Sequence, residues 1–152
     1  MTTSIAVVAL VVTGLLVGVE LCVAVFVNPI LDRLPGDAGL LGRADGGRVL
    51  GRLMPWWYVA SFLLCVAVAV LADGAGSTWA AAAGAALLMV SVVISVTLLV
   101  PINNRAKTWT PGNAPADWRD QVQRWDRLHY LRVAIITAGF ASLALGAVAT
   151  AG

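Results

Sequence analysis

Residues 4–27 read SIAVVALVVTGLLVGVELCVAVFV, an apolar run of 24 residues in which Glu20 is the one ionisable side chain. A helix needs about 20 apolar residues to cross the hydrocarbon core of a bilayer. Asn28-Pro29 follows, and proline removes a backbone donor and disfavours helix at the residue before it. Met1-Thr2-Thr3 carries no positive charge and no cleavage site follows the run, which argues against a signal peptide. We expect a transmembrane helix that stays in the membrane and ends at Val27.

Three later runs are also long and apolar enough to span a bilayer: Trp56 to Ala72, Trp79 to Val100, and Leu131 to Thr150. Strands are excluded as spans, because unpaired sheet edges are not tolerated in lipid and runs of this length suit helices. The sequence therefore predicts an all-α integral membrane four-helix bundle, a single membrane domain over residues 1–152. The connecting segments are 28–55 and 101–130, and the second ends in an amphipathic helical extension that leads into the fourth span.

Composition and the placement of charge agree with this prediction. Of the 152 residues, 60% are hydrophobic and 12% are charged, about half the charged share of a soluble domain. The net charge of +2 and the interspersed acids argue against nucleic-acid binding. All ten Lys and Arg residues lie in the two long connecting segments or at the start of the fourth span. The positive-inside rule thus predicts a multi-pass plasma-membrane protein with both termini outside and both long segments cytoplasmic.

Other residues within the spans predict packing rather than chemistry. Small residues at four-residue spacing favour close helix contacts, within the bundle or in a homo-oligomer. They are Ala134, Ala138, Ser142, Gly146 and Thr150 on the fourth span, with Gly14 and Gly18 on the first. The aromatic residues at span ends are typical of the belts that anchor helices at the membrane interface. They are Trp56, Trp57, Tyr58 and Trp79. Cys22 and Cys65 lie inside apolar runs and are expected to be reduced.

Glu20 is unusual because it lies eight residues before Asn28, about 12 Å from that end of the helix. A charge at the bilayer centre costs about 2.5–3.5 kcal/mol on insertion scales. We therefore expect Glu20 to face the bundle and to have a partner. It is either a structural ion pair or protonated carboxyl, or part of a functional site.

The approach to the fourth span combines an amphipathic helix with the single histidine of the chain. Asn113 or Asp117 can cap the start of this helix. Residues at steps of three and four then share one helical face. They are Trp118, Val122, Trp125, His129, Arg132 and Ile136. An interfacial helix with Trp anchors explains part of this pattern, whereas His129 has a side chain that can exchange a proton near neutrality.

Short motifs that contain asparagine follow the first and third spans. They are Asn28-Pro29 and Pro101-Ile-Asn-Asn-Arg105. Their side chains either cap helix ends or line a pocket with Glu20 and the face that bears His129. A mostly apolar pocket with a few convergent polar groups is the usual form of a ligand site. The chain has no CxxC, HExxH, GxSxG or phosphate-loop spacing. No cofactor is evident, and a metal site or a haem with His129 as axial ligand stays an open alternative.

The motifs Asn28-Pro29, Pro101-Ile-Asn-Asn-Arg105 and Trp125-x-x-x-His129-x-x-Arg132 resemble the pattern of the anthrone oxygenase-like family of small four-helix membrane proteins. In layout the resemblance covers most of the chain. It implies that a lipophilic activated aromatic, typically an anthrone in a polyketide pathway, is oxygenated to an anthraquinone with dioxygen as co-substrate and without an evident bound cofactor.

An anthrone has an acidic CH between two aryl rings, and its enolate can pass an electron to dioxygen. An enzyme for this step needs a base near neutrality, donors for the enolate oxygen and a dry apolar cavity. The candidate catalytic residues are His129 as the base and Arg132, Asn103 and Asn104 as donors. The candidate substrate-binding residues are Trp125, which can stack on a flat ring, Asn28 and Glu20. Glu20 either orients His129 or pairs with Arg132.

Two other functions stay open at this point. One is a non-catalytic membrane accessory or small-molecule binding protein, and the other is a metal- or haem-dependent redox protein. A cytoplasmic pocket that contains both His129 and Arg132 favours the enzyme. His129 at a helix end among lipid head groups favours the binding protein.

Overall fold

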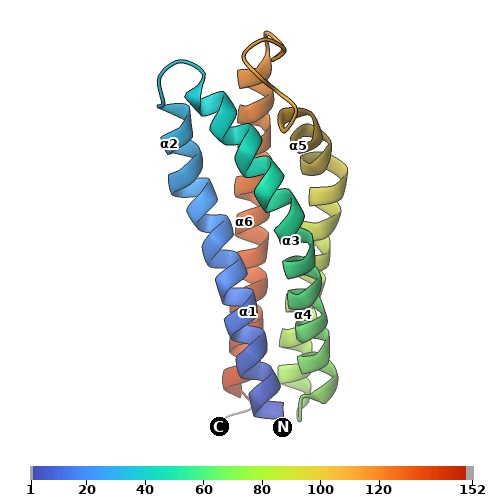
Figure 1. Cartoon of the computed structure of the whole chain (residues 1–152). Helices are drawn as coiled ribbons and strands as arrows, with labels where there is room; N and C mark the ends of the chain where they lie inside the picture. The colour runs from blue at the N-terminus through green and yellow to red at the C-terminus, as the bar shows by residue number, and fades with distance from the viewer. Residues whose placement is uncertain (1, 150–152) are drawn as a thin grey trace.

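A computed structural model of the chain describes residues 2–149, which form helices joined by short connections and contain no strand. Four long helical segments run side by side, and both termini lie at one end of the bundle (Figure 1). Each is long and apolar enough to cross a membrane, and they extend over Thr3–Asp32, Ala38–Leu71, Ala75–Ala106 and Trp118–Val148. The predicted all-α bundle is confirmed, as is the prediction of four helices long and apolar enough to span a membrane.

The first and third segments are each made of three consecutive helical pieces. The elements are α1 (Thr2–Cys22), η1 (Val23–Val27), α2 (Asn28–Asp32), α3 (Ala38–Leu71), α4 (Ala75–Ile94), η2 (Ser95–Leu99), α5 (Val100–Ala106) and α6 (Trp118–Ala149). All four segments extend further than the apolar runs that predicted them. The expected connections 28–55 and 101–130 are therefore largely helical.

Two π-turns interrupt the long helices, and each precedes a proline. The N–H of Asn28 donates to the carbonyl of Val23, and the N–H of Val100 donates to the carbonyl of Ser95. Both bonds span five residues rather than four. Pro29 and Pro101 explain the wider turns, because a proline ring clashes with the carbonyl four residues earlier in a regular α-helix. The predicted helix end at Val27 is wrong, since the helix continues through the proline as α2.

Glycines let α2 fold back against the first turns of α3. A Cβ atom on Gly39 would lie 2.4 Å from the carbonyl oxygen of Leu31, and one on Gly42 would lie 2.6 Å from its Cδ2. A larger residue at Gly39 would displace the backbone of α2, whereas one at Gly42 would require only the Leu31 side chain to move. The glycine-rich start of the second segment is thus a helix that is packed closely by its neighbour.

In the bundle α1 and α4 each pack against both α3 and α6, and α4 with α6 form the most extensive pair. A Cβ atom on Gly84 would lie 2.9 Å from the carbonyl oxygen of Gly139, and Ser142 Oγ donates to the Ala80 carbonyl at 2.8 Å. The predicted small-residue stripe on the fourth span is therefore only partly a packing face. Ser142 and Gly146 meet α4, Ala134 and Ala138 are exposed, and Thr150 lies outside the described residues.

The start of α6 is the amphipathic helix that the sequence predicted. Its inward face carries Val122, His129, Arg132 and Ile136, which are buried, with Trp118 and Trp125 half-buried beside them. Asn113 does not cap this helix; its side chain bonds to Thr110 and Thr108 within the preceding loop. The extension thus places the histidine and an arginine inside the bundle.

Candidate functional site

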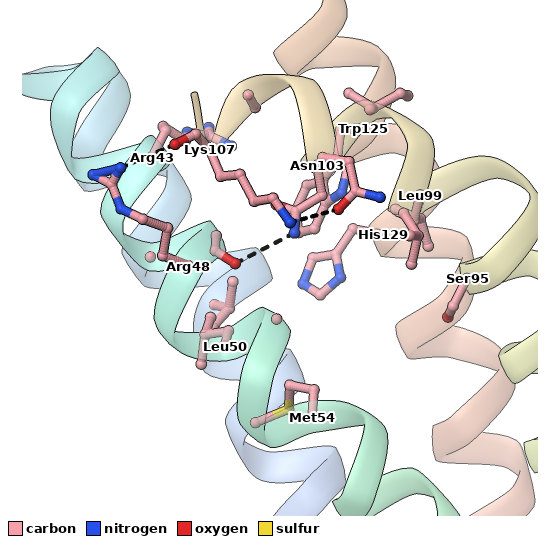
Figure 2. Close-up of a pocket in the computed structure, with 18 of the residues that line it drawn as sticks. Arg43, Arg48, Leu50, Met54, Ser95, Leu99, Asn103, Lys107, Trp125 and His129 are labelled. Atoms are coloured by element: carbon pink, nitrogen blue, oxygen red, sulfur yellow. Dashed lines mark hydrogen bonds between the residues drawn. The ribbon is translucent and has the colours of Figure 1, made fainter. Parts of the chain in front are cut away.

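A cavity of about 640 Å³ lies between the four segments at the end of the bundle opposite the termini. Its volume is in the range of small-molecule sites. Its wall is mostly apolar and is formed by the end of α1, η1, α2, the first part of α3, the end of α4, η2, α5 and α6. Figure 2 shows His129 pointing from α6 toward the centre, with Leu50 and Met54 of α3 on one side and Ser95 and Leu99 on the other.

All seven residues that the sequence proposed for a site line this cavity. They are Glu20, Asn28, Asn103, Asn104, Trp125, His129 and Arg132. They come from three of the four segments and are separated by up to 112 positions in the chain. The structure therefore brings the predicted set together at one place.

Glu20 and Arg132 form a buried ion pair between α1 and α6. Arg132 Nη2 lies 2.5 Å from Glu20 Oε2, and the two residues are 9% and 3% exposed. Arg132 Nη1 also donates to Ser95 Oγ at 3.1 Å. The expectation that Glu20 faces the bundle and has a partner is confirmed. Because neither charge reaches water, each depends on the other for compensation.

His129 is 1% exposed and bonds through both ring nitrogens. Its Nδ1 lies 3.0 Å from Arg132 Nη2, and its Nε2 lies 3.2 Å from the carbonyl oxygen of Glu20. A guanidinium only donates, so Nδ1 accepts and the proton of a neutral imidazole lies on Nε2. Glu20 Oε2 is 3.4 Å from Nδ1, and Trp125 stacks on the ring at 4.7 Å between centroids. The imidazole is held in one orientation.

Tyr58 belongs to this network, and its sequence-based assignment to an interfacial aromatic belt is wrong. Its hydroxyl donates to Glu20 Oε1 at 3.1 Å, and its ring lies 5.5 Å from the Arg132 guanidinium carbon. The signal that reveals it is helical spacing, since Tyr58, Ser61 and Cys65 follow steps of three and four on one buried face. Its neighbour Trp56 is 76% exposed, as a belt residue would be.

A second polar cluster closes the cavity near α2. Asp126 accepts hydrogen bonds from Arg43 at 2.7 and 2.8 Å and from the amide of Asn28 at 2.8 Å. Arg43 also pairs with Asp32 at 2.7 Å. The amide of Asn28 therefore joins α2 to α6. Arg43 and Asp126 had no signal in the sequence, because their contact joins positions 83 residues apart.

The two asparagines of α5 differ in position. Asn103 is half-buried, and its amide donates to the carbonyl of Gly47 at 3.4 Å. A Cβ atom on Gly47 would lie 2.6 Å from Asn103 Oδ1, so the glycine admits this side chain. Asn104 is exposed and accepts from Lys107 Nζ at 2.8 Å. Asn103 thus lies inside the wall and Asn104 lies at the outer edge.

A family model described as Anthrone oxygenase matches residues 48–142 of the chain. The chain belongs to the anthrone oxygenase family. The match includes Tyr58, Asn103, Trp125, His129 and Arg132. Comparison with curated proteins and with solved structures gives no match.

In this member of the anthrone oxygenase family, three side-chain donors of described residues that line the cavity have no hydrogen-bond partner. They are Nε of Arg43, Nε of Arg132 and Nε1 of Trp125, each buried at the atom. A buried donor without a partner destabilises the folded protein, and it offers a place for an acceptor atom of a ligand. No group of three or more His, Cys, Asp or Glu side chains arranged for a metal ion occurs within residues 2–149.

Proposed function

We propose that the chain is a membrane-embedded oxygenase that oxidises a lipophilic, anthrone-like aromatic with dioxygen inside this cavity. Its membership of the anthrone oxygenase family supports the class of reaction. The observation that carries the proposal is the buried Glu20–Arg132–His129 network in the wall of a mostly apolar cavity. Such a wall excludes water while it offers a base and charged donors.

The proposed reaction consumes one dioxygen and returns one water. A proton leaves the CH₂ group of the anthrone, and the resulting enolate passes one electron to dioxygen. The substrate radical and superoxide then join through a new C–O bond, and the peroxide takes up a proton. The remaining C–H bond and the O–O bond break, which releases water and leaves the second carbonyl of the quinone.

Each network residue has a role in the first step. The free Nε of Arg132 and Nε1 of Trp125 would hold the substrate oxygen as it gains charge. A guanidinium that turns toward this oxygen releases Nδ1 of His129, which can then accept the proton. The imidazolium formed would face Glu20 Oε2, which is 3.4 Å away. Glu20 thus balances positive charge before and after the transfer, and Tyr58 holds its other oxygen.

We place the cavity on the cytoplasmic side of the plasma membrane, with both termini outside. All ten Lys and Arg residues belong to segments at the cavity end of the bundle, and the positive-inside rule assigns that end to the cytoplasm. The proposed step needs dioxygen as co-substrate and no bound cofactor, since the enolate itself is the reductant.

The test is oxygen uptake with anthrone in membranes that contain the intact protein, after subtraction of the uptake by membranes without it. We expect His129→Gln to lower protein-dependent uptake by about 10²–10⁴-fold, the usual contribution of a general base. The exposed Trp79, far from the cavity, supplies the matched control Trp79→Phe. Intact protein without uptake above background would refute the proposal, and uptake that survives His129→Gln would remove this residue from the mechanism.

A non-catalytic carrier of the same aromatic is the second candidate. The observation that favours it is that both nitrogens of His129 already have hydrogen-bond partners. Anaerobic binding of anthrone that is followed by no oxygen uptake when air is admitted would support the carrier over the oxygenase.

A further inference from the structure

We infer that the ligand of this cavity is a flat aromatic that carries one anionic group, such as a carboxylate, which Arg48, Arg52 and Lys107 hold at the outer edge. These three residues are called the cationic rim below. The inference rests on the proposed function, because it names the class of aromatic that the same cavity takes. It concerns binding, so it can fail independently of the oxidation.

The inner cations of the cavity are already compensated. Arg132 pairs with Glu20. Arg43 pairs with Asp32 and with Asp126, and its side chain is only 8% exposed. In the cavity without a ligand, both guanidinium groups therefore already have a carboxylate partner.

The cationic rim is different, because two of its three cations have no acidic partner among the described residues and the third has only an exposed one. Arg52 has no ion pair or hydrogen bond among the described residues. Lys107 bonds through Nζ to the neutral amide of Asn104. Arg48 has one carboxylate, that of Asp45, at 3.6 Å, and Asp45 is 72% exposed. At the level of the cationic rim the cavity therefore presents positive charge that is available to an anion.

The cationic rim comes from two facing elements that are joined to each other. Arg48 and Arg52 are one turn apart on α3, and Lys107 follows the last residue of α5. Arg48 Nη1 donates to the carbonyl of Lys107 at 2.9 Å, and Figure 2 shows both residues at the same end of the cavity. All three side chains line the cavity. The charges are thus grouped at its mouth rather than spread over the outer surface.

The distance between the cationic rim and the inner network suits a fused ring system. Tyr58 marks the level of the network on α3, and Arg52 and Arg48 precede it by six and ten residues. At 1.5 Å per residue these steps correspond to about 9 and about 15 Å along the helix. Met54 and Leu99 are among the apolar residues of the wall. A three-ring aromatic of that length would place an oxygen at Arg132 and Trp125 and an anionic substituent at the cationic rim.

The test compares two probes that share one ring system, anthracene-2-carboxylate and its methyl ester, which lacks the negative charge and carries one additional methyl group. Binding is measured by equilibrium dialysis against the intact protein in phosphatidylcholine nanodiscs under nitrogen, with uptake by empty nanodiscs subtracted. An exposed ion pair contributes about a two- to fivefold change in affinity. Three cations together should make the carboxylate bind about tenfold or more tightly than the ester.

The variants assign the preference to the cationic rim. Arg48→Gln with Arg52→Gln should reduce the preference to about threefold or less, while binding of the ester stays unchanged. Arg105→Gln is the matched control, since Arg105 belongs to α5 and is exposed but does not line the cavity. It should leave the preference intact. Equal binding of both probes by the intact protein, or equal loss in Arg105→Gln, would overturn the inference.

A lipid head group is the other source of an anion at this level. The carboxylate titration is therefore repeated in nanodiscs that contain phosphatidylglycerol. If this lipid removes the preference of the intact protein, the cationic rim binds lipid and the inference is overturned. If the preference persists, the aromatic anion is supported. Oxygen uptake with anthrone is scored separately, so a preference without uptake refutes the oxygenase alone, and uptake without a preference refutes the anionic ligand alone.

Discussion

The Glu20–Arg132 ion pair makes a quantitative prediction for the variant Glu20→Gln. Removal of one charge from a buried pair leaves the other uncompensated, which destabilises a protein by about 3–5 kcal/mol. Glutamine keeps the shape of the side chain, and its amide oxygen can still accept from Arg132. Arg132 also retains Ser95 Oγ at 3.1 Å and His129 Nδ1 at 3.0 Å. We therefore expect the lower end of the range, about 3 kcal/mol.

The assay is reversible unfolding in mixed micelles by titration with sodium dodecyl sulfate, followed by tryptophan fluorescence. The double variant Glu20→Leu/Arg132→Met should recover most of the loss, because apolar replacement of a whole buried ion pair is often neutral. Asp45→Asn is the control, since it breaks a pair on the protein surface and should change the free energy of unfolding by less than about 1 kcal/mol.

A loss of less than about 1 kcal/mol in Glu20→Gln would refute this reasoning. It would mean that water reaches Arg132 and that the pair behaves as a surface pair. A double variant that is less stable than either single variant would refute it in another way, because packing rather than charge would then dominate.

Three further substitutions test the cavity, the helix packing and the second polar cluster. Gly46 lines the cavity and a Cβ there meets nothing within 4 Å, so Gly46→Leu should weaken binding of anthracene-2-carboxylate about tenfold without loss of stability. Gly18→Leu, at an equally open position outside the cavity, should change neither the binding nor the stability. Equal effects of Gly46→Leu and Gly18→Leu on binding would contradict the prediction that the ligand occupies this cavity. A Cβ on Gly84 would lie 2.9 Å from a carbonyl oxygen of α6. Gly84→Val should therefore lower the free energy of unfolding by about 1–3 kcal/mol in the detergent titration. An unchanged free energy of unfolding would mean that α4 and α6 are not in close contact. Asp126→Asn leaves Arg43 with one carboxylate and should cost about 1.5–3 kcal/mol in the same titration. A loss larger than that of Glu20→Gln would show that Asp32 gives no compensation.

The fold was largely predictable because the bilayer imposes a length and a composition on each span. The run from Ser4 to Val27 and its three counterparts are 17 to 24 residues long, within the range of about 17–25 that a helix needs to cross the hydrocarbon. The helix ends were harder to predict. Pro29 was expected to follow the end of a helix, yet it follows a π-turn in a helix that continues, and Pro55 lies inside α3. Tertiary packing thus overrides the local preference of proline.

The candidate site was predictable where a residue was unusual for its place. Glu20 stands out as a carboxyl inside a span, and His129 as the one histidine, on the same helical face as Arg132. Tyr58 and Arg43 were missed because their residue types are ordinary at span ends. Only the three-dimensional arrangement shows that Tyr58 donates to Glu20 and that Arg43 is held between two carboxylates.

The π-turns also determine in which direction the side chains of Asn28 and Asn103 point around the helix axis. Each turn inserts one residue without an equal advance along the axis, so the side chains that follow are rotated by about 100° relative to an uninterrupted α-helix. Asn28 comes directly after η1 and Asn103 comes four residues after η2. Deletion of a single residue from either π-turn would swing the corresponding amide toward lipid while every side chain of the cavity remained in the sequence. The number of residues in two helices, as much as their identity, therefore determines which groups face the interior.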